Sequence, residues 1–129
     1  MNAADRGSAT LVAALVVAIV LTAMVGLGSL TVLYGVRAEA NNAADAAALA
    51  AAVATYPPAG AGDPRAEAAR YAGANGAVLV SCDCTVDSQL EVRKATVIVE
   101  KEVTVPFFGT LKVRAGATGE FDPVAWLGG

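Results

Sequence analysis

Residues 8–36 read SATLVAALVVAIVLTAMVGLGSLTVLYGV, a run of 29 residues without a charged side chain. A helix needs roughly 20 apolar residues to cross a hydrocarbon core about 30 Å thick. We therefore predict a transmembrane helix over residues 8–36, preceded by a short leader at residues 1–7. Residues 37–56 are rich in alanine, the strongest helix former, and no Gly-Pro break separates them from the span. We expect one continuous helix from Ala9 to Thr55, half in lipid and half outside, with Ser8 or Thr10 as its N-cap.

Small side chains recur every four residues within the predicted span. They are Thr10, Ala14, Ala18, Thr22 and Gly26. This spacing places them along one helix face, where a ribbon of small residues lets a second helix approach closely in lipid. A span rich in Ala, Gly, Ser and Thr also produces such spacing by chance. The ribbon is a candidate packing surface for partner helices.

The part of the chain after the span has room for one small domain. Aromatic residues make up only 5% of the sequence, so its core should be thin and built from valine and alanine. Proline and glycine predict a loop at residues 57–63, and Asp63-Pro64 and Asn75-Gly76 bracket a short helix over residues 64–74. Its predicted buried residues are Ala68, Ala69, Tyr71 and Ala72. The stripe of Leu49, Val53 and Tyr56 on the long helix is expected to dock on the chain's own sheet.

From Ala77 onward the apolar residues alternate with a period of two, which predicts three or four antiparallel strands with one wet face. The parity of the alternation changes near Arg93-Lys94-Ala95, which predicts a bulge or tight turn there. Residues 119–129 show no period and are left as an unassigned tail. The expected fold class is α+β: a long N-terminal helix, followed by a small domain over residues 64–118 that holds a short helix and a small antiparallel sheet.

Charge and composition argue against several classes of function. The chain has 9 Lys and Arg against 12 Asp and Glu, and it has no histidine. Without a basic cluster a nucleic-acid partner is not expected, and without histidine the commonest general base and metal ligand is absent. Glu100 and Glu102 share one strand face and are interpreted as a solvated surface. We expect no enzymatic activity, no catalytic or metal-binding residues and no cofactor.

Cys82-Asp83-Cys84 is the one group of residues with potential for chemistry. The pair fits a structural or incidental role best. An oxidised redox pair or an intermolecular bridge is a second interpretation, although the usual redox motif has two intervening residues and a helix N-terminus. A metal site is the third, and it would have to draw on carboxylates such as Asp83 and Asp87, which suit zinc poorly.

The sequence allows several interpretations of the membrane orientation and the cleavage of the predicted span. Ala38-Glu39-Ala40 offers a signal-peptidase pattern, but the apolar run is about twice as long as a signal peptide requires, so we favour an uncleaved anchor. Arg6 before the span faces only Asp5, whereas acidic residues accompany Arg37 beyond it. The positive-inside rule then favours a cytoplasmic N-terminus, with the C-terminal domain outside a cell membrane that the chain crosses once.

Three segments resemble the TadE/TadG-like proteins of tight-adherence (Flp) pilus assembly, most closely the small TadE-like proteins of high-GC Gram-positive bacteria. They are residues 5–10 before the span, the motif after it, and residues 75–82 leading into the valine-rich strands. The motif is Asn42, Ala43, Ala44, Asp45, Ala46, Ala47, Ala48 and Leu49, followed by Ala50. The resemblance implies a pilin-like fold and a non-enzymatic single-pass envelope protein, acting as a minor pilin-like subunit or assembly factor.

The family also implies a prepilin-type processing site between Gly7 and Ser8, with a prepilin-type peptidase as partner. Pilin-like substrates usually carry Glu five residues after the cut, where this chain has Val12. Arg6-Gly7-Ser8 equally fits a basic residue at the membrane surface followed by a helix start. The expected partners are membrane lipid and other pilus-assembly or pilin-like subunits, contacted through the transmembrane helix. The alternative function is a surface-tethered or secreted binding module unrelated to pili.

Overall fold

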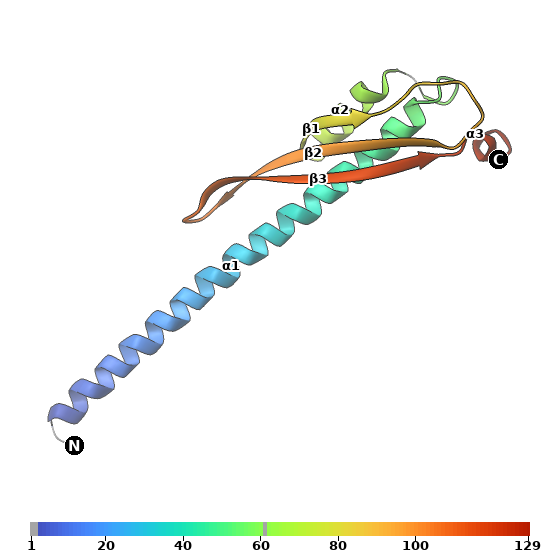
Figure 1. Cartoon of the computed structure of the whole chain (residues 1–129). Helices are drawn as coiled ribbons and strands as arrows, with labels where there is room; N and C mark the ends of the chain where they lie inside the picture. Colours follow the sequence, from blue (N-terminus) through green and yellow to red (C-terminus); the bar gives the residue numbers. More distant parts are fainter. Residues whose placement is uncertain (1–2, 61) are drawn as a thin grey trace.

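The computed structural model describes residues 3–60 and 62–129, with side chains described from Gly7 onward. Its first element is α1, a continuous helix over Ala3–Ala54 (Figure 1). The helix begins before the predicted caps Ser8 and Thr10, because the alanines near its start favour helix. Met1 and Asn2 of the predicted leader, and the side chains of Asp5 and Arg6, lie outside the described residues. At 1.5 Å per residue α1 is about 78 Å long.

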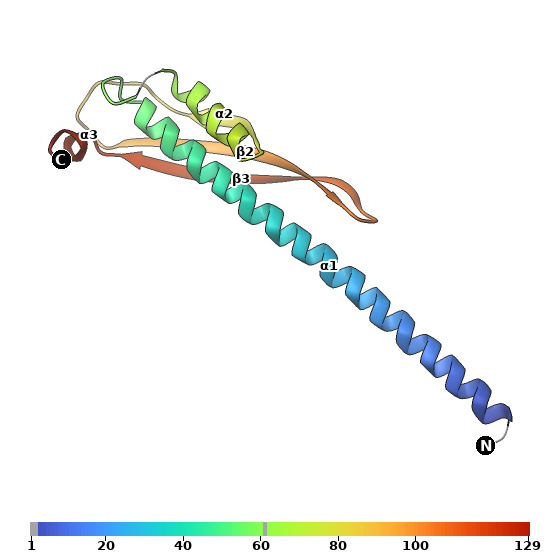
Figure 2. The same cartoon turned by 180° about the vertical axis from the view of Figure 1, so that it is seen from behind.

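The described chain contains one helix that is long and apolar enough to cross a membrane. Every residue from Gly7 to Gly28 is exposed in the isolated chain, and partial burial begins only at Ser29. The N-terminal half of α1 therefore projects away from the rest of the molecule (Figures 1 and 2).

The second helix, α2, spans Pro64–Ala74, as the sequence predicts. The Asp63 carboxylate accepts a hydrogen bond from the Arg65 backbone N–H at 3.1 Å, which caps the first turn. The predicted buried side was partly wrong. Pro64, Ala68 and Ala72 are buried, whereas Ala69 and Tyr71 are exposed, because only the narrow ridge at four-residue spacing faces the molecule.

Three antiparallel strands, β1 over Val78–Asp83, β2 over Arg93–Val105 and β3 over Gly109–Phe121, form a sheet in the order β1-β2-β3. The predicted bulge near Arg93 was wrong, because β2 pairs with β3 without a break from Arg93 to Val105. The register shift lies instead in β1, between Leu79 and Ser81. Leu90 and Val92, whose parity suggested the bulge, are exposed and precede β2.

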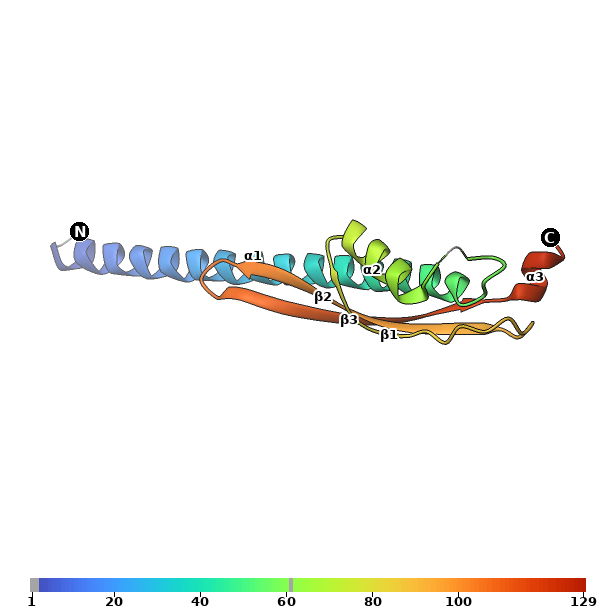
Figure 3. The ribbon, with the colours of Figure 1, turned by 90° about the horizontal axis from the view of Figure 1, so that it is seen from above.

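Figure 3 shows two layers, with the helices over one face of the sheet. α1 contacts β2 and β3, and α2 contacts α1 and β1. The core between the layers consists of alanine and valine, as predicted, with Val97 and Val99 fully buried in β2. This combination of a long helix, a short helix and a small antiparallel sheet confirms the α+β class.

The docking face of α1 is made of alanines rather than of the predicted Leu49, Val53 and Tyr56 stripe. The fully buried residues on α1 are Ala40, Ala43, Ala44, Ala47, Ala48, Ala51 and Ala52. Leu49 is 58% exposed, and only Tyr56 of the predicted stripe is buried. Alanine was preferred because it lets the helix axis approach the sheet closely, which a leucine side chain would prevent.

The C-terminal segment is ordered against the far end of α1. β3 continues through Phe121, past the expected end of the α+β region at residue 118, and α3 follows over Pro123–Leu127. The Asp122 carboxylate caps α3 by accepting from the Val124 N–H at 2.9 Å. Tyr56, Phe121 and Trp126 form an aromatic cluster with ring centroids 6.2 to 6.4 Å apart. This cluster fastens residues 119–129, for which the sequence predicted no structure.

Candidate assembly surface

The small-residue ribbon lies on the free half of α1. All five of its residues, Thr10, Ala14, Ala18, Thr22 and Gly26, are exposed. The Thr22 hydroxyl donates to the Ala18 carbonyl at 2.8 Å, so this polar group is satisfied within the helix. Ala18 and Thr22, with Ile19 and Ala23, line a shallow hollow. The ribbon thus offers a surface of small side chains on which a second helix can pack closely in lipid.

The ribbon face continues into the face that the sheet covers. Thr22, Gly26, Ser29, Leu33, Val36 and Ala40 follow one another at alternating spacings of four and three. These spacings keep residues on one side of a helix. The first two are exposed, the next three are half-buried and Ala40 is fully buried. One stripe of α1 therefore passes from full exposure to intramolecular contact.

The family motif supplies most of the intramolecular part of this stripe. Within residues 42–49, Ala43, Ala44, Ala47 and Ala48 have no exposed surface, while Asn42, Asp45 and Leu49 face outward. The pairs of buried alanines recur at a spacing of four, which is the signal that sequence reasoning missed. The motif is therefore a docking surface for the sheet.

A close approach of β3 completes this contact. A Cβ atom at Gly119 would overlap the Ala48 carbonyl oxygen and lie 2.6 Å from its carbonyl carbon and 2.8 Å from the Leu49 nitrogen. These are backbone atoms, so the helix cannot yield by turning a side chain. Gly119 is therefore required for the distance between helix and sheet.

An ion pair fixes the sheet along the helix axis. The Lys101 ammonium donates to Glu39 at 2.5 Å, joining the inner face of β2 to α1 across 62 residues of sequence. Lys101 is 19% exposed at its side chain, whereas Glu39 is 60% exposed. The pair lies just beyond the uncharged run, so it places the middle of β2 level with the first charged turns of α1.

The outer face of the sheet carries a ladder of charges. Glu100 accepts from Arg114 Nε at 2.9 Å and pairs with Lys112 at 3.2 Å. Arg114, and then Lys112, hold the pKa of the Glu100 carboxyl below its ordinary value. The ionised Glu100 carboxyl therefore contributes to stability at pH values above its pKa in the unfolded chain. This contribution is lost as the pH falls through the lowered pKa that Glu100 has in the folded protein. Glu100 and Glu102 thus serve as partners in surface ion pairs.

Leu49 and Val53 line a groove between α1 and α2. The groove has a volume of about 560 Å³, and Glu67, Arg70 and Tyr71 form its other wall. Glu67 and Arg70 pair at 2.6 Å, and the Arg70 guanidinium lies 4.6 Å from the centre of the Tyr71 ring. The wall residues are therefore already engaged with one another.

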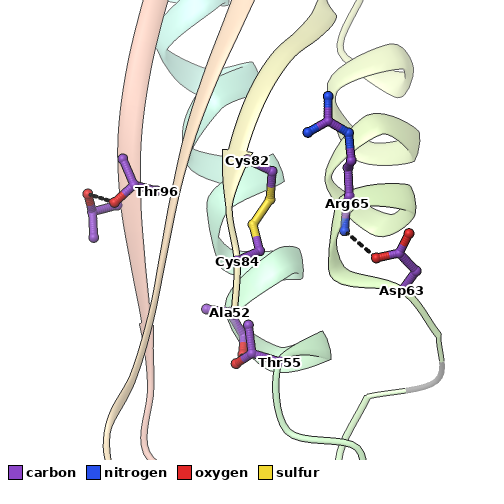
Figure 4. The surroundings of a disulfide bond; sticks show 8 residues. Ala52, Thr55, Asp63, Arg65, Cys82, Cys84 and Thr96 are labelled. Atoms are coloured by element: carbon purple, nitrogen blue, oxygen red, sulfur yellow. Dashed lines mark hydrogen bonds between the residues drawn. A yellow bond between two sulfur atoms is a disulfide. The ribbon is translucent and has the colours of Figure 1, made fainter. Parts of the chain in front are cut away.

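Cys82 and Cys84 are joined in a disulfide at the end of β1, with their Cα atoms 5.4 Å apart. Figure 4 shows the bond, and both residues pack against the alanine core. Within residues 3–60 and 62–129 no cluster of three or more His, Cys, Asp or Glu side chains suits a metal. A redox role for this pair stays a prediction.

The two predicted cleavage points both fall within α1. Gly7 and Ser8 lie near its N-terminal end, where helices fray. Ala40 is fully buried against the sheet. Cleavage after Ala40 would cut a docked helix, whereas Gly7 and Ser8 are both exposed.

Comparison with known proteins matches residues 7–54 to the model of the Flp pilus-assembly TadE/G-like family. Neither the curated proteins nor the solved structures give a match. The matched residues contain the ribbon, the Asn42 to Leu49 motif and nearly all of α1. Over these residues, the chain is therefore similar to the TadE/G-like family of Flp pilus-assembly proteins.

Proposed function

We propose that this chain is a single-pass membrane protein that acts as a minor pilin-like subunit or assembly component of a Tad/Flp-type pilus or related secretion system. The carrying observation is the exposed ribbon on α1, within the segment that matches the family. The N-terminus lies in the cytoplasm, and the sheet lies on the extracytoplasmic side. The chain works by assembly and catalyses no reaction.

Two features support helix-to-helix assembly. The ribbon is free of large side chains, and its Thr22 hydroxyl is turned back onto the helix backbone. Association in lipid depends on such close packing, because the membrane offers no hydrophobic driving force between helices. The docked sheet supplies a second surface for neighbouring subunits, with its ladder of ion pairs facing outward.

The ribbon can be tested with one leucine. We expect Ala18→Leu to lower association with partner subunits, or with a second copy, by about tenfold in a membrane reporter assay, a loss of roughly 1.4 kcal/mol. Ala9→Leu is the matched control, because residue 9 is exposed and lies about 180° around the helix from Ala18. Equal association of the two variants would contradict assembly through the ribbon and favour the binding-module alternative, in which α1 is only an anchor.

The N-terminus of the mature protein tests the processing proposal. The intact mass of protein recovered from membranes of a host with the native peptidases is expected to begin at Met1 or at Ser8. A start at Ser8 would make the chain a processed pilin-like subunit despite Val12, and a start at Met1 a permanent assembly component. A start at Asn41 would contradict both and make it a secreted domain.

A further inference from the structure

The loop end of the β2–β3 hairpin is an uncharged, aromatic tip. Residues 103–111 read VTVPFFGTL, with Glu102 and Lys112 as the nearest charges on either side. Phe107 is 88% exposed and Phe108 is 70% exposed. Two adjacent phenylalanines at this exposure are unusual for a loop in water, because each ring leaves a large apolar surface exposed to solvent instead of burying it in the core.

The backbone holds these rings outward. Phe107 has a φ of 70°, the one positive value among the described residues other than glycine, and Gly109 with a φ of 82° completes the turn. Positive φ is unfavourable for a bulky L-residue. Val105, two residues earlier, is buried, so the turn separates an inward valine from outward aromatic rings.

The hairpin points back along α1 toward its N-terminal half (Figures 1 and 3). Lys101 is level with Glu39 through their ion pair. The strand continues four residues to Val105, which is roughly 13 Å at 3.3 Å per residue. Over that distance α1 rises through about nine residues, so the tip lies level with about residue 30. Partial burial on α1 begins at Ser29, in agreement.

The membrane boundary falls at the same level. Residues 8–28 form about 31 Å of helix, which fills a hydrocarbon core of about 30 Å. The remaining uncharged turns, residues 29–36, then lie in the interfacial region of the extracytoplasmic leaflet. Tyr34 is 74% exposed there, in the zone where aromatic residues anchor membrane proteins.

We propose that the hairpin tip inserts Phe107 and Phe108 into the interfacial lipid of the bilayer that α1 crosses. This inference rests on the transmembrane placement of α1 proposed above. The uncharged tip, its outward rings and its level on α1 all fit this occupant. The second attachment fixes the tilt of the sheet against the membrane, so that α3 is held at the end of the molecule farthest from the lipid.

Depth-dependent fluorescence quenching in vesicles tests this placement. The full chain carries Phe107→Trp with Trp126→Phe and is reconstituted in phosphatidylcholine vesicles containing lipid brominated at the headgroup end of its acyl chains. We expect its emission to be quenched about twofold or more, as for an interfacial side chain. Wild-type protein, whose single tryptophan Trp126 lies at the opposite end of the sheet, is the control and should stay unquenched.

A third variant separates this inference from the proposed span. Leu21→Trp with Trp126→Phe places the probe in the middle of residues 8–36 and should be quenched most by lipid brominated near the chain ends. Quenching at position 21 without quenching at position 107 would overturn the tip insertion alone. Blue-shifted but unquenched emission from tryptophan at position 107 would also overturn the tip insertion, because it would show that protein and not lipid surrounds the probe. No quenching at position 21 would overturn the span itself.

Discussion

Replacing Gly119 with alanine is expected to destabilise the packing of β3 on α1 by about 3 kcal/mol, at the upper end of the usual overpacking cost. The added Cβ would overlap the Ala48 carbonyl. Because both surfaces are backbone, the sheet must move away from the helix, which opens gaps beside Val97 and Val99. A small domain has only about 5–15 kcal/mol of stability in total, so this loss is large.

Gly116→Ala is the matched control, on the same strand and three residues away. A Cβ at Gly116 would lie 3.5 Å from the Val97 carbonyl and 3.8 Å from the Ile98 side chain, which is ordinary contact. Urea unfolding of the full chain in detergent, followed by Trp126 fluorescence, reports the docking of the sheet, because Trp126 packs on Tyr56 and Phe121. Equal midpoints for the two variants would contradict the close approach at Gly119.

Local signals in the sequence were sufficient to predict α1 and α2, whereas α3 lies in the tail that was left unassigned. Asp63-Pro64 and Asn75-Gly76 defined α2 because capping and stop residues act within one turn. The long uncharged run and the alanines after it defined α1, although not its start at Ala3. Alternation also identified β2 and β3, but it suggested a bulge near Arg93, because Leu90 and Val92 were counted with a strand that begins after them.

Contacts between distant segments could not be predicted in this way. Hydrophobicity favours Leu49 and Val53 as a docking stripe, but close packing of a helix on a sheet selects alanine. Because alanine occurs on every side of this segment, its positions do not indicate which face docks. The level of the hairpin tip on α1 follows from the Lys101–Glu39 pair, which joins residues 62 positions apart. The sequence consequently predicts the ribbon of the candidate surface but not the stripe that joins it to the sheet.

The alanine face can be tested by adding one large side chain. Ala44→Leu is expected to lower the free energy of unfolding by about 3 kcal/mol, because overpacking a closed site forces strained rotamers or backbone shifts. Ala44 has no exposed surface and belongs to the alanine core. Helix propensity does not oppose the change, since leucine ranks close to alanine.

Ala46→Leu is the matched control, because residue 46 is only half-buried and borders the groove beside α2, which has room for the added atoms. Urea midpoints from Trp126 fluorescence should therefore fall strongly for Ala44→Leu and change little for Ala46→Leu. If both variants unfolded at the wild-type midpoint, the family motif would not be the docking face. The same motif positions the sheet relative to the ribbon. Ala44→Leu should therefore also weaken assembly that needs the sheet, while leaving the helix contact of the ribbon intact. Ala18→Leu should have the opposite pattern, with the sheet docked and the helix contact weakened.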